Sequence, residues 1–246
     1  MIKNLAKFFI FLMLVFFSSN AKATFDVYGF KTDGTGQEYC KGMISGTISK
    51  KTGKDLYNFL HAKVNPKTCK LDNGGILGSK LLKVIHVTES KGGDLLAAIT
   101  IISMMQDYQI AAETWDRGPK YRANMCNSSC AIIFAGAPFR HYVIGINKGS
   151  QYPPISSKFG LHKPEFLAPE SAFKSSVERE MEYDQLKYKL IEIVGKVGVK
   201  ADFIIKTFET SNNDVFVPLY VDLLMWNVVT SKYPYDPKNA WDPYYK

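Results

Sequence analysis

The sequence lacks the long apolar runs, charge blocks and repeats that mark several large classes of protein. Beyond residue 23 no segment is apolar enough to cross a membrane, so we expect no stable membrane span there. The lysines are scattered, without a long run and without interleaved aromatic residues, so the net charge of +8 does not indicate nucleic-acid binding. Internal repeats and low-complexity segments are absent.

Cysteine and histidine are also scarce. The four cysteines, Cys40, Cys69, Cys126 and Cys130, are not spaced as in a zinc site, and no histidine pair accompanies them. We therefore expect no zinc site.

The N-terminus has the pattern of a cleavable signal peptide. Lys3 and Lys7 form a positive region, residues 8–17 an apolar core, and residues 21–23 an A-x-A cleavage site. Cleavage after Ala23 would leave residues 24–246, which we expect to form a single periplasmic or secreted domain. An irregular, aromatic and proline-rich C-terminal arm is expected from about residue 231.

In an oxidising compartment the cysteines are expected to form disulfides, and three pairings are possible. We favour Cys126–Cys130, which is local and would hold the intervening turn, together with Cys40–Cys69. The second bridge closes a long loop and is worth about 3–4 kcal/mol on the loop-entropy model.

The hydrophobic pattern predicts an α/β fold. Residues 81–88 form a buried strand, which is followed by a glycine turn, an apolar helix over residues 94–106 and a strand over residues 109–115. This is a βαβ unit, and the next unit ends at a serine turn. Outside these units the pattern predicts strands over residues 43–48 and 142–146, helices over residues 54–64, 169–194 and 201–209, loops over residues 65–79 and 147–157, and a last apolar element over residues 221–229.

Residues 125–140, MCNSSCAIIFAGAPFR, are the most informative stretch. A polar turn leads into an apolar run, as at the mouth of a buried helix. A serine there lies where free N–H groups and the helix dipole favour an oxyanion. Serine also caps helices for structural reasons alone, and an isolated Ser-Ser pair favours that reading.

A hydrolytic serine needs a base, and there are four histidines. His61 lies on a predicted surface helix and His86 in a buried strand, where a hydrogen-bonded core histidine is expected. His141 has no clear role. His162 follows a short extended segment, at a position open to a cleft.

Four segments together resemble the proteolytic subunit of Clp protease, in the family's order. They are residues 89–93 (the S-P-G-G turn), 128–133 (the nucleophile segment), 160–164 (the histidine turn) and 214–216 (the D-x-F segment). Secreted bacterial proteins of the same superfamily are more similar still: they carry a signal peptide, a C-x-S-x-C turn, a G-x-x-R and a G-x-H-x-P. Here the arginine comes one residue late, at Arg140.

The resemblance implies a role for each matching residue. Ser128 would be the nucleophile, His162 the general base and Asp214 its orienting carboxylate. The backbone N–H groups of Gly93 and Ser129 would bind the oxyanion.

This chain also departs from the family pattern. Lys91 replaces the proline of the glycine turn, and residues 129–130 replace Met-Gly after the serine. An aspartate in a turn, such as Asp214, usually has a structural role. Asp222 lies nearby in the sequence and is an alternative carboxylate for the triad.

The resemblance thus implies a ClpP/crotonase-like α/β fold of repeated ββα units, with an ATP-independent serine peptidase that acts on peptides or proteins. The acyl-transfer mechanism of such a peptidase needs no metal or organic cofactor. Such subunits often form homo-oligomers. An inactive fold that binds a peptide or an envelope partner is the alternative, because function depends on the site rather than on the fold. An acyl-thioester enzyme of the crotonase group is disfavoured, because its usual coenzyme is cytosolic.

Overall fold

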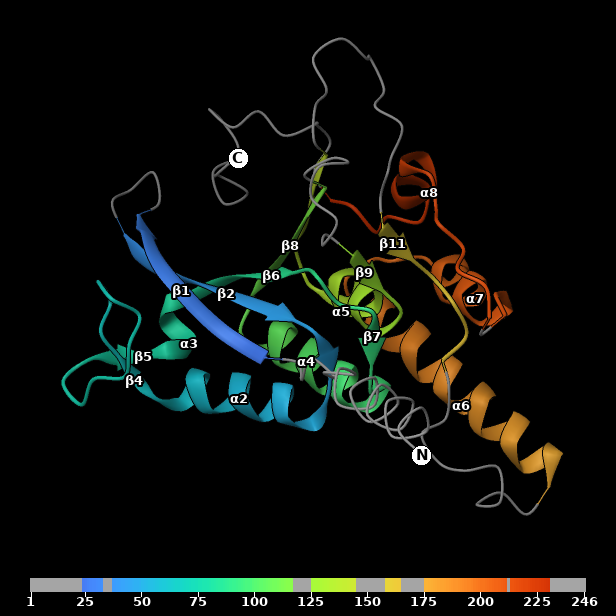
Figure 1. Ribbon diagram of the computed structural model, residues 1–246, viewed down its shortest axis with the longest axis horizontal. Coiled ribbons are helices and arrows are strands. Elements are labelled where there is room, and N and C mark those ends of the chain that lie inside the picture. The colour runs from blue at the N-terminus through green and yellow to red at the C-terminus, as the bar shows by residue number, and fades with distance from the viewer. Residues whose placement is uncertain are drawn as a thin grey trace, which may run out of the picture.

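The computed structural model describes residues 24–32, 37–116, 125–144, 158–164, 175–211 and 213–230. A five-stranded sheet in the order β1-β2-β6-β8-β10 forms its framework (Figure 1). The first two strands, β1 (Thr24–Thr32) and β2 (Glu38–Ser45), are antiparallel. The other three, β6 (Leu82–Val87), β8 (Ala111–Asp116) and β10 (Arg140–Ile144), continue from β2 in parallel.

Short strands form a second layer beside this sheet. β3 (Thr47–Ile48) pairs with β7 (Gly92–Gly93), and β9 (Met125–Asn127) pairs with β11 (Lys158–Gly160), both in parallel. A bridge between Ser90 and Cys126 connects the two pairs. β2, β6 and β8 are thus each followed by a short strand and then by a helix, and the predicted α/β fold of repeated ββα units is confirmed.

The helices after the short strands pack on one another beneath the sheet. They are α2 (Lys50–His61), α4 (Leu95–Asp107) and α5 (Ser129–Gly136), with contacts between α2 and α4 and between α4 and α5. Every residue of α5 is buried, as expected for a helix without a charged side chain. A Cβ on Gly136 would lie 2.6 Å from Ile102, so this glycine lets α5 approach α4 closely.

The remaining elements lie at the two ends of this stack. α3 (Gly78–Leu81), β4 (Lys63–Val64) and β5 (Ile76–Leu77) lie beside the C-terminal end of α2 (Figure 1). α6 (Ser176–Gly195), α7 (Ala201–Glu209) and α8 (Tyr220–Met225) lie on the side of α5. None of the helices in the described segments is long and apolar enough to traverse a bilayer.

Most predicted elements are found, with shifted ends. α7 has the predicted bounds, whereas α2 starts four residues before the predicted helix, because the Ser49 N–H is held by the Thr52 hydroxyl at 3.2 Å. The prediction was wrong for residues 63–64, which pair as β4 instead of ending the helix. The predicted signal peptide, the loop over residues 147–157 and the C-terminal arm lie outside the described residues.

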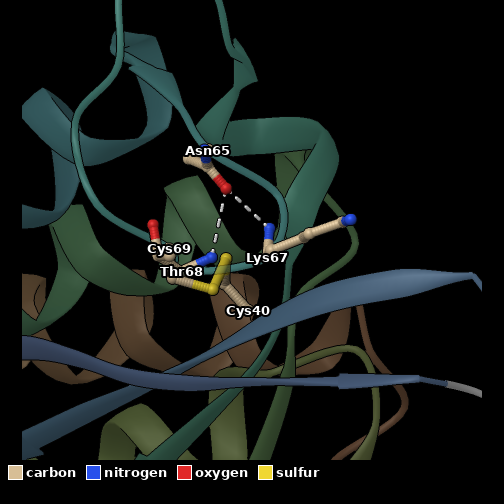
Figure 2. Close-up of a disulfide and its surroundings, with 5 residues drawn as sticks. All are labelled: Cys40, Asn65, Lys67, Thr68 and Cys69. Atoms are coloured by element: carbon tan, nitrogen blue, oxygen red, sulfur yellow. Dashed lines mark hydrogen bonds between the residues drawn. A yellow bond between two sulfur atoms is a disulfide. The ribbon is translucent and has the colours of Figure 1, made fainter.

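The favoured disulfide pairing is present. Cys40, on β2, is bonded to Cys69 in the loop between β4 and β5 (Figure 2), and Cys126 is bonded to Cys130. The first bridge fastens a peripheral loop to the central sheet, and the second spans the turn between β9 and α5.

Arg140 is buried at the start of β10 and connects the ends of three helices. Its guanidinium donates hydrogen bonds to the carbonyls of Ala137 (2.5 Å), Val197 (3.2 Å), Asn227 (2.9 Å) and Val228 (3.0 Å). These carbonyls follow α5, α6 and α8, where helix dipoles favour a cation. Burial lowers the pKa of Arg140 to about 10, which leaves it charged at neutral pH.

Candidate active site

Ser128 occupies a strained turn between β9 and α5. Its φ of 54° and ψ of −124° lie in a region that costs a non-glycine residue about 1–3 kcal/mol. Two bonds hold it there: the Cys126–Cys130 disulfide closes the turn around it, and its N–H donates to the Gly160 carbonyl at 2.8 Å. Strain that the surrounding structure maintains in this way is typical of a functional position.

The Gly92–Gly93 strand lies against this turn. A Cβ on Gly92 would be 2.5 Å from the Cβ of Ser128 and 3.0 Å from its Oγ, so a larger residue would displace the serine. Gly93 has a φ of 147°, and a Cβ there would be 2.2 Å from the Ile48 carbonyl. The buried Ser90 hydroxyl shapes the turn by accepting the Gly92 N–H at 3.1 Å. Ser90 and Gly92 were not among the predicted site residues, although both lie in the glycine turn of residues 89–93.

The two neighbouring serines differ in what their hydroxyls do. The Ser129 hydroxyl donates to the Gly93 carbonyl at 2.8 Å, and only 1% of this residue is exposed. The Ser128 hydroxyl caps no helix N–H and has no hydrogen-bond partner among the described residues, while 6% of Ser128 is exposed. Ser128 therefore offers the available hydroxyl, and Ser129 fastens α5 to the glycine strand.

Two backbone N–H groups flank the Ser128 hydroxyl. That of Ser129 belongs to the first residue of α5, where no carbonyl of the helix can accept it. The Asp94 N–H donates to the Ile48 carbonyl at 2.8 Å. Because N–H groups alternate along a strand, that of Gly93 faces away from Ile48, on the side of β7 next to Ser128. These are the two groups predicted to bind an oxyanion.

His162 lies at the same end of the short strands as Ser128. β9 and β11 run in parallel with Asn127 opposite Gly160, so Ser128 and His162 both follow the carboxyl ends of their strands. The half-buried imidazole has Nδ1 3.0 Å from the Lys163 carbonyl. If Nδ1 carries the proton, Nε2 is the basic nitrogen. Within the described segments no hydrogen bond connects His162 with Ser128.

Asp214 lies near the histidine segment without touching His162. Leu161 and Phe216 exchange both backbone hydrogen bonds, at 2.8 and 2.9 Å, which brings the Asp214 turn beside His162. The Asp214 carboxylate is exposed and makes no hydrogen bond to another described residue. Asp222 is occupied as a cap of α8, because its carboxylate accepts the Leu219 N–H at 2.8 Å.

The other histidines lie away from this turn. His61 is exposed on α2 and His86 is buried in β6, as the sequence analysis expected. His141, in β10, is half-buried, and its pKa is lowered by burial, with Glu113 acting in the opposite direction. Among the described residues there is no cluster of His, Cys, Asp and Glu that could hold a metal ion.

Comparison with known proteins gives distant structural relatives. No protein-family model and no characterised protein sequence matches this chain. A mutant of ClpP1 from Listeria monocytogenes is similar in structure, with 16% identity, a TM-score of 0.46, and coverage of 77% of this chain and 88% of that chain. A mutant of 1510-N, a membrane-bound stomatin-specific protease, has 12% identity, a TM-score of 0.47, and coverage of 76% and 75%. At these identities the chemistry of the site has to follow from its own geometry.

Proposed function

We propose that this protein is a serine hydrolase, with Ser128 as nucleophile, and that its substrates are peptides or proteins. The observation that carries the proposal is the strained Ser128 turn, which directs an unbonded hydroxyl to the N-terminus of a buried helix beside the Gly92–Gly93 strand. A serine that only capped α5 would accept a helix N–H, and Ser128 does not. The choice of peptide substrates rests on the segment resemblance to Clp protease subunits.

The chemistry would be acyl transfer. His162 Nε2 takes the proton of Ser128 as Oγ attacks the substrate carbonyl carbon. The N–H groups of Gly93 and Ser129 stabilise the resulting oxyanion. His162 then returns the proton to the leaving amine, and water hydrolyses the acyl-enzyme by the same steps. No metal or organic cofactor takes part in this scheme.

The third member of the triad would be Asp214. The Lys163 carbonyl holds Nδ1 here, and the Asp214 role requires its turn to bring the carboxylate to that nitrogen. Exchanging Asp214 for Asn tests this role, with Asp222→Asn as the control on the neighbouring cap. A loss of activity in Asp222→Asn alone would contradict the assignment.

We propose further that the chain is exported and works without ATP. Two buried disulfides fit an oxidising compartment, where ATP is not supplied. The predicted mature N-terminus is Thr24. N-terminal sequencing of the protein from the cell envelope tests this, and a retained Met1 would contradict it.

A fluorophosphonate probe gives the most direct test of the nucleophile, because it labels only an activated serine. We expect labelling of the parent protein and of Ser129→Ala, whose N–H is retained. Ser128→Ala should not label, and His162→Ala should label slower by several orders of magnitude. Labelling of Ser128→Ala together with loss of labelling in Ser129→Ala would show that the nucleophile is Ser129 instead of Ser128.

The second candidate function is that of an inactive fold that binds peptides or an envelope partner. In this structure Ser128, His162 and Asp214 are not connected by hydrogen bonds. Catalytic hydrogen bonds are often long without substrate, so this arrangement is compatible with both functions. Failure of the folded parent protein to label or to hydrolyse any peptide in a broad library would favour the binding protein.

A further inference from the structure

The positive charge of the chain is concentrated in one region, residues 50–83, here called the lysine-rich region. It contains eight lysines, two aspartates and no glutamate, a net charge of +6 against +8 for the whole chain. Lys3, Lys7 and Lys22 contribute +3, so the rest of the chain has a net charge of −1. In the sequence these lysines are spread along the region without a continuous run. The fold brings seven of them together on α2, β4, the β4–β5 loop and α3, which adjoin one another (Figure 1), while Lys83 lies in β6.

The outer surface of this region is available to a partner. All of its lysines except Lys83 are exposed. On α2 the side chains of Leu56 and Leu60 face the core, while Lys54, Tyr57 and His61 are exposed on the opposite side. The helix therefore presents a basic and aromatic surface along its length.

Large apolar side chains are exposed among these lysines. Leu71 is 75% exposed, and Ile76 and Leu77 are more than two-fifths exposed. Leu71 and Ile76 pair with Val64 from opposite sides, and directly paired residues lie on the same face of a sheet. They form an exposed apolar pair, here called the apolar tip, and the exposed Lys70 directly precedes Leu71 in the chain.

This loop is held in shape by its own bonds. The Cys40–Cys69 disulfide anchors it to β2, and the Asn65 side chain accepts the N–H groups of Lys67 (2.9 Å) and Thr68 (3.2 Å), as Figure 2 shows. The Gly74 N–H and the Asn65 side chain donate to the Asp72 carboxylate and lower its pKa. The Asp72 carboxylate is thus hydrogen-bonded within the loop. The Lys67 side chain, by contrast, extends away from the disulfide (Figure 2).

We propose that the lysine-rich region is a docking surface for a membrane that contains anionic lipids. Lysines would contact the lipid phosphates while Leu71 and Ile76 enter the boundary between headgroups and acyl chains. Charge complementarity favours an anionic surface, and a rigid apolar tip among lysines fits a surface that is both charged and apolar. A nucleic acid or a soluble acidic protein would use the lysines but would leave exposed aliphatic side chains without a function.

Docking here would also affect the candidate site. α2 begins directly after β3, the strand that pairs with Gly92–Gly93. A membrane bound to α2 would therefore lie near the candidate active site. This position would favour substrates at the membrane surface. The docking itself does not depend on the hydrolase activity.

Vesicle sedimentation tests the proposal directly. The parent protein is mixed with phosphatidylcholine vesicles and with vesicles that also contain about 30% phosphatidylglycerol, a typical anionic lipid. We expect binding to the anionic vesicles that weakens as salt is raised. The double variant Lys67→Gln/Lys70→Gln should bind about 30-fold more weakly, at about fivefold per lysine. Leu71→Ser/Ile76→Ser should bind about tenfold more weakly, from lost apolar insertion.

Two control pairs, on α6 and at its C-cap residue Lys196, match these variants in chemistry. Lys189→Gln/Lys196→Gln removes two exposed lysines, and Val177→Ser/Met181→Ser removes two exposed apolar side chains. Both controls should bind as the parent does. All proteins carry the same N-terminus, so that any lipid affinity of residues 8–17 is common to them.

Three results would overturn the proposal. The first is equal binding to neutral and anionic vesicles, and the second is an equal loss in the α6 controls. The third is binding to soluble polyglutamate that needs Lys67 and Lys70, together with vesicle binding that does not change in Leu71→Ser/Ile76→Ser. That pattern would identify a soluble acidic partner instead.

Discussion

Gly92 lies so close to Ser128 that a Cβ on the glycine would be 2.5 Å from the Cβ of the serine. The two residues come from different ββα units, and neither has a negative φ. The close approach of these two backbones puts the Ser128 hydroxyl beside the Gly93 N–H. Position 92 therefore needs glycine for two reasons: a Cβ would not fit against Ser128, and its φ is 100°.

Replacing Gly92 by alanine should abolish labelling of Ser128 by a fluorophosphonate, because the new methyl group displaces the hydroxyl from the oxyanion donors. We also expect the free energy of unfolding to fall by about 1–3 kcal/mol from strain and overpacking. Gly195→Ala is the matched control, since a Cβ there meets no atom within 4 Å. Normal labelling by Gly92→Ala would show that Ser128 is not positioned by this strand.

The two disulfides should have separable effects. Cys126→Ala/Cys130→Ala releases the turn around Ser128, so this residue can leave its strained backbone conformation. Its hydroxyl is then no longer held in position, and the labelling rate should fall at least about tenfold. Cys40→Ala/Cys69→Ala should lower the free energy of unfolding by about 3.5 kcal/mol on the loop-entropy model, without changing labelling of the folded protein. Labelling rates and urea unfolding curves of both variants measure these effects. Equal labelling by both would mean that the inner bridge does not hold the site.

Arg140 should be among the least replaceable residues for stability. Arg140→Met leaves four carbonyls without a donor, and we expect the free energy of unfolding to fall by at least about 4 kcal/mol. Arg140→Lys should recover only part of this, because an ammonium group cannot reach all four in the geometry of a guanidinium. Urea unfolding, with exposed Lys196→Gln as control, measures the difference. A near-parental Arg140→Lys would contradict the bridging role.

His141 should make the fold less stable in mild acid. Burial lowers its pKa in the folded chain, so below the ordinary histidine pKa the unfolded chain binds a proton that the folded chain does not. Stability is therefore unaffected above that range and falls as the pH drops through it, by at most about 1.4 kcal/mol between pH 7.5 and 5.5. Urea unfolding at both pH values should show a smaller difference in His141→Gln. An unchanged difference would assign the effect to other groups.

The sequence predicts those parts of the fold whose signal is local. α4 and α7 were predicted within one residue of their ends, because their apolar spacing and flanking residues are contained in one segment. β7, β9 and β11 are only two or three residues long and are strands solely because distant segments pair with them. Propensity within such short segments carries too little information to predict them.

The candidate site shows the same limit. The pattern of residues 125–130 and of the double glycine indicated where Ser128, Ser129 and Gly93 would meet, because turns and helix starts are local features. The bond between Ser129 and the Gly93 carbonyl distinguishes the two hydroxyls, and it depends on the packing of α5 against β7. The excess of lysine over residues 50–83 can be seen in the sequence, but the exposure of Leu71 and Ile76 among these lysines depends on the fold.

The Leu161–Phe216 pair has a consequence for synthesis of the chain. The segment with Ser128 leaves the ribosome well before Phe216, so for that time the strand before His162 has no partner on its outer edge. A nascent chain would thus possess the nucleophile without the completed base. Chains that end before Phe216 would contain Ser128 and His162 but would lack the pairing that brings the Asp214 turn to the histidine segment.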